Sequence, residues 1–318
     1  MSHSPWWLPG GHTQTIWASK VAGDGLRGAV PWQRERVDTP DGDFIDIDHV
    51  RAARPDAPLC ILFHGLEGSR HSHYARAMAA WAQQAQWHLA LPHFRGCSGE
   101  LNRAPRAYHS GDHAEIDFIL RHVVSGYRAR GGRQAHAVGI SLVGNALMVW
   151  AAEQGEVANR WVDSVTSVSS PLDLSAGGHA IGRGLNRLIY TPYFMRTMVP
   201  KAMAKLRQYP GLFDEAAMRR ARNLYEFDNL FTAPLHGFQN TEDYWRRASA
   251  KPRLREIKVR ATLINALNDP FIPADSLPTV ADLSPHCQLR HTPTGGHVGY
   301  VTGPWPPGHI SLPHLLFE

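Results

Sequence analysis

The chain of 318 residues has no long hydrophobic run and few cysteines. No stretch of 18 apolar residues occurs, so no segment is expected to span a membrane. Cys60, Cys97 and Cys287 are odd in number and lack metal or redox spacing, which argues against a disulfide framework and favours a reducing compartment. The beginning, MSHSPWWLPGGHTQTIW, lacks the charged and apolar regions of a secretory signal, so the expected location is cytoplasmic.

Charge of one sign is not concentrated anywhere in the chain. The formal charge is +5, with no run of five like charges and no nucleic-acid motif, so we expect no nucleic-acid partner. His71 and His73 form a His-x-His pair without a carboxylate or cysteine at suitable spacing, which favours a helix start over a metal site. Neither a metal nor a cofactor is expected, and the sequence does not indicate the oligomeric state.

Short apolar runs alternate with segments of helical pattern. The expected strands are 44–50, 58–63, 87–92, 135–139, 162–168, 260–266 and 286–291, and the expected helices are 73–85, 111–129, 142–154 and 274–281. Several of the runs are almost continuously apolar, as in parallel strands that are covered on both faces. The alternation predicts an α/β fold with a mostly parallel central sheet and helices on both faces.

The stretch 171–250 interrupts this alternation. It contains several prolines, is rich in Arg, Tyr, Phe and Met, and carries no clear strand pattern. We expect a helical cap insertion over the carboxyl ends of the strands, with residues 1–170 and 251–318 forming the core. The aromatic residues of this stretch either line an acyl pocket or form the core of the cap; they are Tyr190, Tyr193, Phe194, Phe213, Tyr225, Phe227, Phe231 and Phe238.

The segment VGISLVGNAL (138–147) has the pattern of a nucleophile elbow. Ser141 follows an apolar run and precedes a helical pattern, and Gly139 permits the close backbone approach that a sharp turn needs. A serine hydroxyl becomes a nucleophile only when a base removes its proton. The last glycine of Gly-x-Ser-x-Gly is missing, because Val143 stands there and Gly144 follows one place later. An N-cap serine is the alternative interpretation.

The segment FHGLEGS (63–69) follows another expected strand. A His-Gly turn at this place commonly supplies a backbone N–H to an oxyanion hole. We therefore expect the N–H groups of Leu66 and Leu142 to face a developing oxyanion. An ordinary glycine-rich turn is the alternative.

Two acidic residues follow expected strands. Asp269, in NALNDPFIP (265–273), can hold a histidine in the correct tautomer and stabilise the imidazolium, whereas its neighbour Asn268 cannot. Asp173, in SSPLDL, is the second candidate. A turn aspartate before proline is the alternative for Asp269.

The candidate base is His297 in PTGGHVGY (293–300). It follows two glycines after the last expected strand and lies near the chain end. The order Ser, Asp, His is the order of α/β hydrolases, and it differs from those of chymotrypsin and subtilisin. Ser141, Asp269 and His297 are therefore the expected catalytic residues.

Motifs along most of the chain carry a family resemblance. They are WLPGGHTQTIW (7–17), HGLEGS (64–69), HFRGCSGELNR (93–103), YHSGD (108–112), GISLVGNAL, NALNDPFIP and GGHVGY. The chain resembles the YheT-like branch of the α/β hydrolases, which includes esterases and abhydrolase-domain lipases. The resemblance implies an α/β-hydrolase fold and hydrolysis of carboxylic or lipid esters. It also assigns Ser141 as nucleophile, Asp269 as acid and His297 as base.

The sequence departs from this branch at two places. Relatives usually carry Gly-Gly after Ser-Leu, where this chain has Val143 and Gly144, and they often have two acids where it has Asn268 and Asp269. The second departure leaves one acid, and the first crowds the approach of helix to strand. Valine is tolerable within a helix, so we expect a functional elbow with a slight shift.

The expected function is hydrolysis of small-molecule carboxylic esters, either with short or medium acyl chains or of lipids, through an acyl-enzyme on Ser141. An alcohol O-acyltransferase with the same residues, and a non-catalytic hydrolase-fold binding protein, are the alternatives. The loop HFRGCSGE could bind an anion through Arg95, although a structural role at the mouth of the site is favoured. The aromatics of PWW (5–7) could contact a membrane surface, although packing on the core is favoured.

Overall fold

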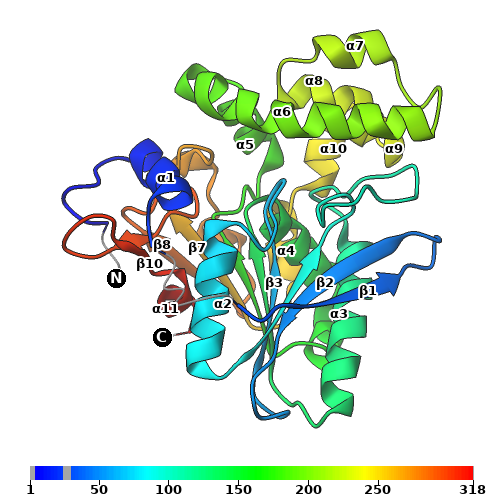
Figure 1. Ribbon diagram of the computed structural model, residues 1–318. Helices are drawn as coiled ribbons and strands as arrows, with labels where there is room; N and C mark the ends of the chain where they lie inside the picture. The colour runs from blue at the N-terminus through cyan, green and yellow to red at the C-terminus, as the bar shows by residue number, and fades with distance from the viewer. Residues whose placement is uncertain (1–3, 24–29, 318) are drawn as a thin grey trace.

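The computed structural model describes residues 4–23 and 30–317, which form a twisted sheet with helices on both faces (Figure 1). The strands are β1 (Gln33–Asp38), β2 (Phe44–Val50), β3 (Leu59–Phe63), β4 (His88–His93), β5 (Ala135–Ile140), β6 (Ser164–Val168), β7 (Ala261–Ala266), β8 (Cys287–Thr292), β9 (Val301–Thr302) and β10 (His309–Ile310). The main sheet has the order β1-β2-β4-β3-β5-β6-β7-β8, and β9 pairs with β10. Pairing is parallel from β4 to β8 and antiparallel at β1-β2 and β2-β4, which confirms the predicted mostly parallel α/β sheet.

Helices cover the two faces of the sheet with separate apolar cores. On one face lie α3 (His113–Ala129) and α4 (Leu142–Gln154), and on the other lie α1 (Gly11–Lys20), α2 (His73–Ala85) and α11 (Leu312–Phe317). Strands β3, β4 and β5 lie between these layers, and almost all of their side chains are buried. This double coverage explains why their sequences are apolar at nearly every position.

The strand register brings loops distant in sequence to one edge of the sheet. Phe63 at the end of β3 lies opposite Gly139 of β5, and Ala266 at the end of β7 lies opposite Thr292 of β8. Because parallel strands end at the same edge, the segments that follow them meet there. Four sequence motifs are thereby gathered above the carboxyl ends of the strands.

The edge strand β1 was not predicted from the sequence. Its residues QRERVD are mostly polar, and only Val37 is buried. Arg34 pairs with Asp48, and Arg36 pairs with Asp46, across the antiparallel partner β2. An edge strand with one solvated face can be stabilised by such cross-strand pairs, so it shows no apolar run.

The predicted helix 274–281 is wrong. The structure has two short 3-10 turns there, η4 (Ala274–Ser276) and η5 (Val280–Asp282). Pro278 lies between them, and proline inside a helix removes a hydrogen bond and clashes with the preceding turn. The side chain and backbone N–H of Thr279 then bond the Asp282 carboxylate and form a capping box for the second turn.

The helices between β6 and β7 lie above the end of the sheet (Figure 1). They are α5 (Leu174–Ile181), α6 (Gly184–Gln208), α7 (Glu215–Arg220), α8 (Leu224–Phe227), η2 (Asp228–Thr232), α9 (Ala233–Leu235) and α10 (Thr241–Ala248), and we call residues 171–250 the helical segment. The segment has its own apolar cluster, which includes Met195, Met198, Met203, Met218, Phe227 and Phe231. No helix in the described part of the chain is long and apolar enough to cross a membrane.

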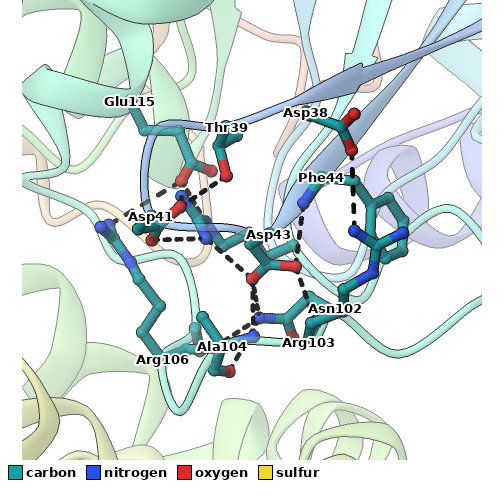
Figure 2. Close-up of polar contacts among 12 residues, drawn as sticks. Asp38, Thr39, Asp41, Asp43, Phe44, Asn102, Arg103, Ala104, Arg106 and Glu115 are labelled. Carbon is teal, nitrogen blue, oxygen red and sulfur yellow. Dashed lines mark hydrogen bonds and ion pairs between the residues drawn. The ribbon is translucent and has the colours of Figure 1, made fainter.

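A network of charged and polar groups, partly buried, holds the loop after β4 against the turn between β1 and β2 (Figure 2). Asp43 accepts hydrogen bonds from the Asn102 side chain at 2.7 Å and from the Arg103 N–H at 2.7 Å. Arg95 binds Asp43 at 2.8 Å and Glu115 at 2.6 Å, and it also bonds Asp41. The guanidinium of Arg95 is therefore occupied by carboxylates of this protein, which favours a structural role over anion binding.

The two tryptophans of PWW take different positions. Trp7 packs against Trp17, with ring centroids 5.6 Å apart, and donates a hydrogen bond to the Gly303 carbonyl. Trp6 is 76% exposed and contacts Trp305, which is also exposed. One tryptophan therefore packs onto the core, and its neighbour lies on the surface.

Candidate active site

Ser141 lies on a strained turn between β5 and α4. Its backbone has φ 54° and ψ −128°, a conformation that L-residues rarely adopt. A Cβ on Gly139 would lie 2.6 Å from Gly144 Cα, and a Cβ on Gly144 would lie 2.6 Å from the Gly139 carbonyl oxygen. The turn therefore requires glycine at both positions, because strand and helix touch through their backbones there.

Val143 points away from this contact. Its side chain is buried among the apolar residues of the core on the α3 and α4 face. The close packing at the turn falls on Gly144, which this sequence retains. The valine therefore occupies a position of ordinary helix packing.

The structure brings Ser141, His297 and Asp269 into one hydrogen-bonded chain. His297 Nε2 lies 2.8 Å from Ser141 Oγ, and His297 Nδ1 lies 2.9 Å from Asp269 Oδ2. Asp269 Oδ1 accepts a hydrogen bond from the Phe271 N–H at 2.8 Å, and the carboxylate is buried. Because a carboxylate only accepts hydrogen bonds, Nδ1 of His297 carries the proton and Nε2 faces the serine hydroxyl.

Asp173, the second candidate acid, has a different place. It is the N-cap of α5, where its side chain accepts a hydrogen bond from the Ala176 N–H at 3.0 Å. An aspartate at this place satisfies a free donor of the helix and interacts favourably with its dipole. Asp269 is thus the acid that lies within hydrogen-bond distance of His297.

The histidine loop is held in a strained conformation. Val298 has φ 54°, which is unfavourable for a β-branched residue. Its N–H donates to Ser169 Oγ at 3.2 Å, and its carbonyl accepts from His73 Nε2 at 2.8 Å. Burial lowers the pKa of His73 to about 4, so this imidazole is neutral near pH 7 and its Nε2–H serves as the donor.

Helix α1 fixes the same loop from the other side. Thr15 Oγ1 accepts from the His297 N–H at 2.8 Å, and Gln14 Oε1 accepts from the Gly295 N–H at 2.9 Å. Asn268 accepts from the Gly296 N–H at 3.0 Å and donates to Gln14. Sequence reasoning missed this role, because residues 11–20 show no apolar period. The motif WLPGGHTQTIW was the available signal.

The loop after β3 leaves one backbone donor free. The Gly65 N–H donates to the Tyr74 hydroxyl at 3.0 Å, and the Glu67 N–H donates to the Tyr108 hydroxyl at 2.8 Å. Between them, the Leu66 N–H has no partner among the described residues. The loop touches the serine, since a Cβ on Gly65 would lie 3.1 Å from Ser141 Cβ.

A second donor comes from α4, and a buried histidine positions the loop. The Leu142 N–H is in the first turn of α4, where no preceding helical carbonyl can accept it. Burial lowers the pKa of His64 to about 3, and its neutral ring accepts from the Phe94 N–H and donates to the Gly65 carbonyl. The N–H groups of Leu66 and Leu142 thus belong to segments next to Ser141, and neither has a hydrogen-bond partner among the described residues.

Ser141 lies where two hollows meet. The first, of about 130 Å³, lies under the helical segment and is mostly apolar; its lining includes Leu174, Phe194, Met198, Phe227, Phe231 and Trp245. The second, of about 530 Å³, is more open and contains His297; its lining includes Ile16, Lys20, Ser72, Ile189 and Tyr193. An ester bound at Ser141 could extend one part into each hollow.

Of the aromatic residues singled out in the helical segment, some line these hollows and others do not. Phe194, Phe227 and Phe231 line the apolar hollow, whereas Tyr190 and Tyr193 line the open one. Phe213 packs behind Phe231, Tyr225 packs on Trp245, and Phe238 packs on Tyr244. Some of these aromatics therefore line a hollow next to Ser141, and others belong to the packing of the helical segment itself.

One ion pair joins the helical segment to the loop that bears Leu66. Lys201 of α6 lies 2.8 Å from the Glu67 carboxylate. Glu67, which follows Leu66, has a backbone φ of 56°. Its N–H donates to the Tyr108 hydroxyl and its carboxylate accepts from Lys201, so both its backbone and its side chain are held. No group of three or more potential metal ligands occurs within residues 4–23 and 30–317.

Comparison with known proteins identifies the same fold and points to esterases. The family model described as alpha/beta hydrolase fold matches residues 58–304. The Escherichia coli (strain K12) protein "Putative esterase YheT" is 37% identical over 276 residues, which cover 86% of this chain and 79% of that protein. The mouse "Phospholipase ABHD3" is 27% identical over 308 residues, covering 92% of this chain and 74% of that protein.

Solved structures share the architecture at low sequence identity. The Pyrococcus furiosus esterase Pf2001 matches with a TM-score of 0.52 and 14% identity, covering 85% of each chain. A bacterial membrane phospholipase A matches with a TM-score of 0.52 and 15% identity, covering 96% of this chain and 88% of that one. At such identity these likenesses concern the fold alone.

Proposed function

This chain belongs to the alpha/beta hydrolase family, in the branch that includes YheT, and on that premise we propose that it hydrolyses carboxylic esters through an acyl-enzyme. The hydrogen-bonded chain of Ser141, His297 and Asp269 is the observation that carries the proposal. Nucleophile, base and acid are separated by normal hydrogen-bond distances, as this chemistry requires.

In the proposed first step, Ser141 Oγ attacks the ester carbonyl carbon while His297 Nε2 takes the hydroxyl proton. Asp269 stabilises the imidazolium that results. The tetrahedral intermediate then collapses, the bond to the alcohol oxygen breaks, and His297 returns its proton to the leaving alcohol. In the second step, His297 Nε2 removes a proton from water while the water oxygen attacks the acyl carbonyl carbon; the tetrahedral intermediate then collapses, the bond to Ser141 Oγ breaks, and His297 returns the proton to Oγ as the carboxylic acid leaves.

We assign the oxyanion hole to the N–H groups of Leu66 and Leu142. The negative charge that develops on the carbonyl oxygen needs donors that are fixed beforehand. The tyrosine hydroxyls of residues 74 and 108 accept the N–H groups on either side of Leu66, and so support its loop. Removing one such donor in a hydrolase typically costs about 100-fold to 1000-fold in kcat.

We propose that the helical segment, residues 171–250, is a cap on a core formed by 1–170 and 251–318. The apolar hollow beneath it would take the acyl chain, because methionine, leucine and phenylalanine side chains contribute much of its wall. The open hollow would take the alcohol part and provide its exit. The relatives named phospholipase and monoacylglycerol lipase support a lipid ester as the substrate class.

A fluorophosphonate probe tests the proposal directly, because it labels only an activated serine. We expect the wild-type protein to react and the Ser141→Ala variant to remain unlabelled. The same variant should lose at least about 1000-fold of turnover on a p-nitrophenyl ester, since loss of a triad member costs several orders of magnitude. A wild-type protein that does not react with the probe or the ester would instead indicate a binding protein with this fold.

Competition between water and ethanol distinguishes hydrolysis from acyl transfer. A hydrolase with an open alcohol site forms mainly the free acid, whereas an acyltransferase excludes water from deacylation and forms mainly the ethyl ester. We expect the acid to dominate. A dominant ethyl ester would assign the same residues to an alcohol O-acyltransferase.

A further inference from the structure

The first half of α6 exposes apolar side chains to solvent. Leu185 is 59% exposed and Leu188 is 73% exposed, and Ile189 and Tyr193 are exposed on the same side of the helix. Their spacing of three and four residues places them in one stripe. The side of α6 that is packed inward carries other apolar residues, among them Met195 and Met198, so this stripe is additional to the packing of the fold.

Helix α1 continues this stripe. Figure 1 shows α1 below the first half of α6, and the Lys20 ammonium lies 5.5 Å from the centre of the Tyr193 ring. His12 Nδ1 of α1 also lies 3.2 Å from the Tyr190 hydroxyl of α6. Ile16 of α1 is 40% exposed. Two helices far apart in the sequence therefore present one surface, which we call the α1–α6 surface: Ile16, Lys20, Leu185, Leu188, Ile189 and Tyr193.

The charge of both helices has one sign. Neither α6, with 25 residues, nor α1, with 10 residues, contains an aspartate or glutamate. Arg187 and Arg196 of α6 are exposed and form no ion pair within the described part of the chain. Apolar side chains together with unpaired cations are the combination that binds the boundary between lipid headgroups and acyl chains.

The open hollow that leads to Ser141 and His297 ends at the same surface. Ile16, Lys20, Ile189 and Tyr193 line this hollow as well as the surface. A folded protein bound to the α1–α6 surface would cover the entrance of the open hollow. A lipid surface bound there would instead place lipid molecules at that entrance, which favours a lipid surface as the occupant.

We propose that the α1–α6 surface docks the protein on an anionic lipid surface, so that an ester lipid can pass into the open hollow without crossing water. Leu185 and Leu188 would enter the acyl-chain boundary, and Arg196, which lies on the same side of α6, would meet anionic headgroups. The transfer of an ester rests on the proposed function, whereas the docking itself does not depend on catalysis.

Cosedimentation with lipid vesicles tests the docking. The parent protein for this test is the full chain with Ser141→Ala, so that no lipid is hydrolysed during the measurement. The vesicles contain phosphatidylcholine alone or phosphatidylcholine and phosphatidylglycerol in equal parts. We expect binding to the mixed vesicles, and at least about tenfold weaker binding after Leu185→Asp with Leu188→Asp, because two apolar contacts are replaced by repelled carboxylates. Aspartate is compatible with the first turns of a helix, so α6 should persist.

A matched control uses Val157→Asp with Val280→Asp, which places the same two charges on exposed valines of η1 (Gly155–Arg160) and η5, outside the α1–α6 surface. It should bind vesicles as the parent does. Arg196→Glu should reduce the preference for phosphatidylglycerol. The proposal is overturned if the parent binds neither kind of vesicle, or if the double aspartate variant binds as strongly as the parent.

The parent could instead self-associate without binding vesicles. If the double aspartate variant abolishes that self-association, the α1–α6 surface is assigned to a protein partner.

Activity separates this inference from the proposed function. With Ser141 present, the double aspartate variant should cleave a soluble short-chain p-nitrophenyl ester as the wild type does, which also shows that it folds. Its activity on an ester embedded in mixed vesicles should fall by about tenfold. Loss of activity on both substrates would contradict a role limited to docking, and an inactive wild type that still binds vesicles would refute only the proposed function.

Discussion

The loops at the sheet edge and the helical segment above them are held in different ways. Each loop that carries a candidate catalytic group has its backbone fixed by buried polar contacts. The His297 loop is held by Thr15, Gln14 and Asn268, and the Leu66 loop by two tyrosine hydroxyls. Glu67 and Val298, which lie on these two loops, have strained backbone angles that such contacts maintain.

The helical segment has an apolar cluster of its own. Its central cluster is made of methionine, leucine and phenylalanine side chains, which are adaptable in shape. Polar links also join the segment to the sheet side; they include Lys201 with Glu67, Lys205 with the Asn102 carbonyl, His236 with the Ala107 carbonyl, Asn186 with the Pro270 carbonyl and the Tyr244 hydroxyl with the Ser110 N–H. The comparison teaches that the geometry for chemistry is in the rigid part, whereas the shape offered to a substrate is in the adaptable part.

If the loops at the sheet edge hold the catalytic geometry, the largest loss of kcat should follow substitution of the acid Asp269. Asp269→Asn should lower kcat by about 1000-fold to 10,000-fold, because an amide cannot hold the same tautomer of His297. Asp173→Asn should change kcat less than about threefold, since asparagine is also a good N-cap. Steady-state kinetics on a p-nitrophenyl ester measure both, and the reverse ranking would move the acid to the helical segment.

Stability should also depend on the polar contacts of the sheet side. Burial opposes ionisation of Asp43, but hydrogen bonds from Asn102, the Arg103 N–H and Arg95 outweigh it and lower the pKa to about 2. Asp43→Asn should therefore cost about 3 kcal/mol of unfolding free energy near pH 7, because Arg95 loses a buried partner.

The pH dependence of that cost has a definite sign. A lowered folded-state pKa gives stability that is present above the unfolded pKa and is lost as the pH falls through the folded one. The difference between wild type and Asp43→Asn should thus be constant above about pH 5 and shrink between about pH 4 and pH 2. Urea unfolding across this range measures it, and a difference that does not vary with pH would exclude an ionised Asp43.

Substitutions in the helical segment should change the preference for acyl-chain length and leave the catalytic activity itself in place. Phe231→Leu removes volume from the wall of the apolar hollow and should raise kcat/KM for long acyl esters relative to short ones by about tenfold. Phe213→Leu is the control, because Phe213 packs against Phe231 without lining the hollow. Equal effects of the two substitutions on the ratio would show that packing, and not the wall of the hollow, sets the preference.

The smallest effect is expected at Val143, although it lies two residues from the serine. Because Gly144 provides the close contact and Val143 faces the core, Val143→Gly should change kcat/KM by less than about tenfold, or about 1.4 kcal/mol. A fluorophosphonate assay of both proteins complements the kinetics. A silent wild type that this substitution activates would show that the valine had switched the site off.

Sequence patterns identified much of this molecule because some constraints are local. Apolar runs gave the strands from β2 to β8, and the alternation with helices gave the parallel sheet. The candidate groups Ser141, Asp269 and His297 each follow a strand, which is where an α/β sheet gathers its ligands. Pro278, which should have excluded a helix over 274–281, was a local signal that was overlooked.

Other features have no local signature. The charged strand β1 is stabilised by partners on β2, and α1 is positioned by contacts with loops almost 300 residues away. Sequence spacing cannot show which of several glycines meets a facing backbone, so Val143 looked like a defect of the elbow until the contact was located at Gly144.

The sequence by itself determined the α/β order of elements, the strained Gly-x-Ser turn and the chain order of the three candidate catalytic residues. Periodicity, glycine and proline act within a few residues, so these features can be read locally. Only the tertiary structure decided that Asp269 and not Asp173 reaches His297, that Leu66 keeps a free N–H, and that α1 and α6 form one surface. These outcomes depend on strand register and on packing between distant segments, which no local pattern specifies.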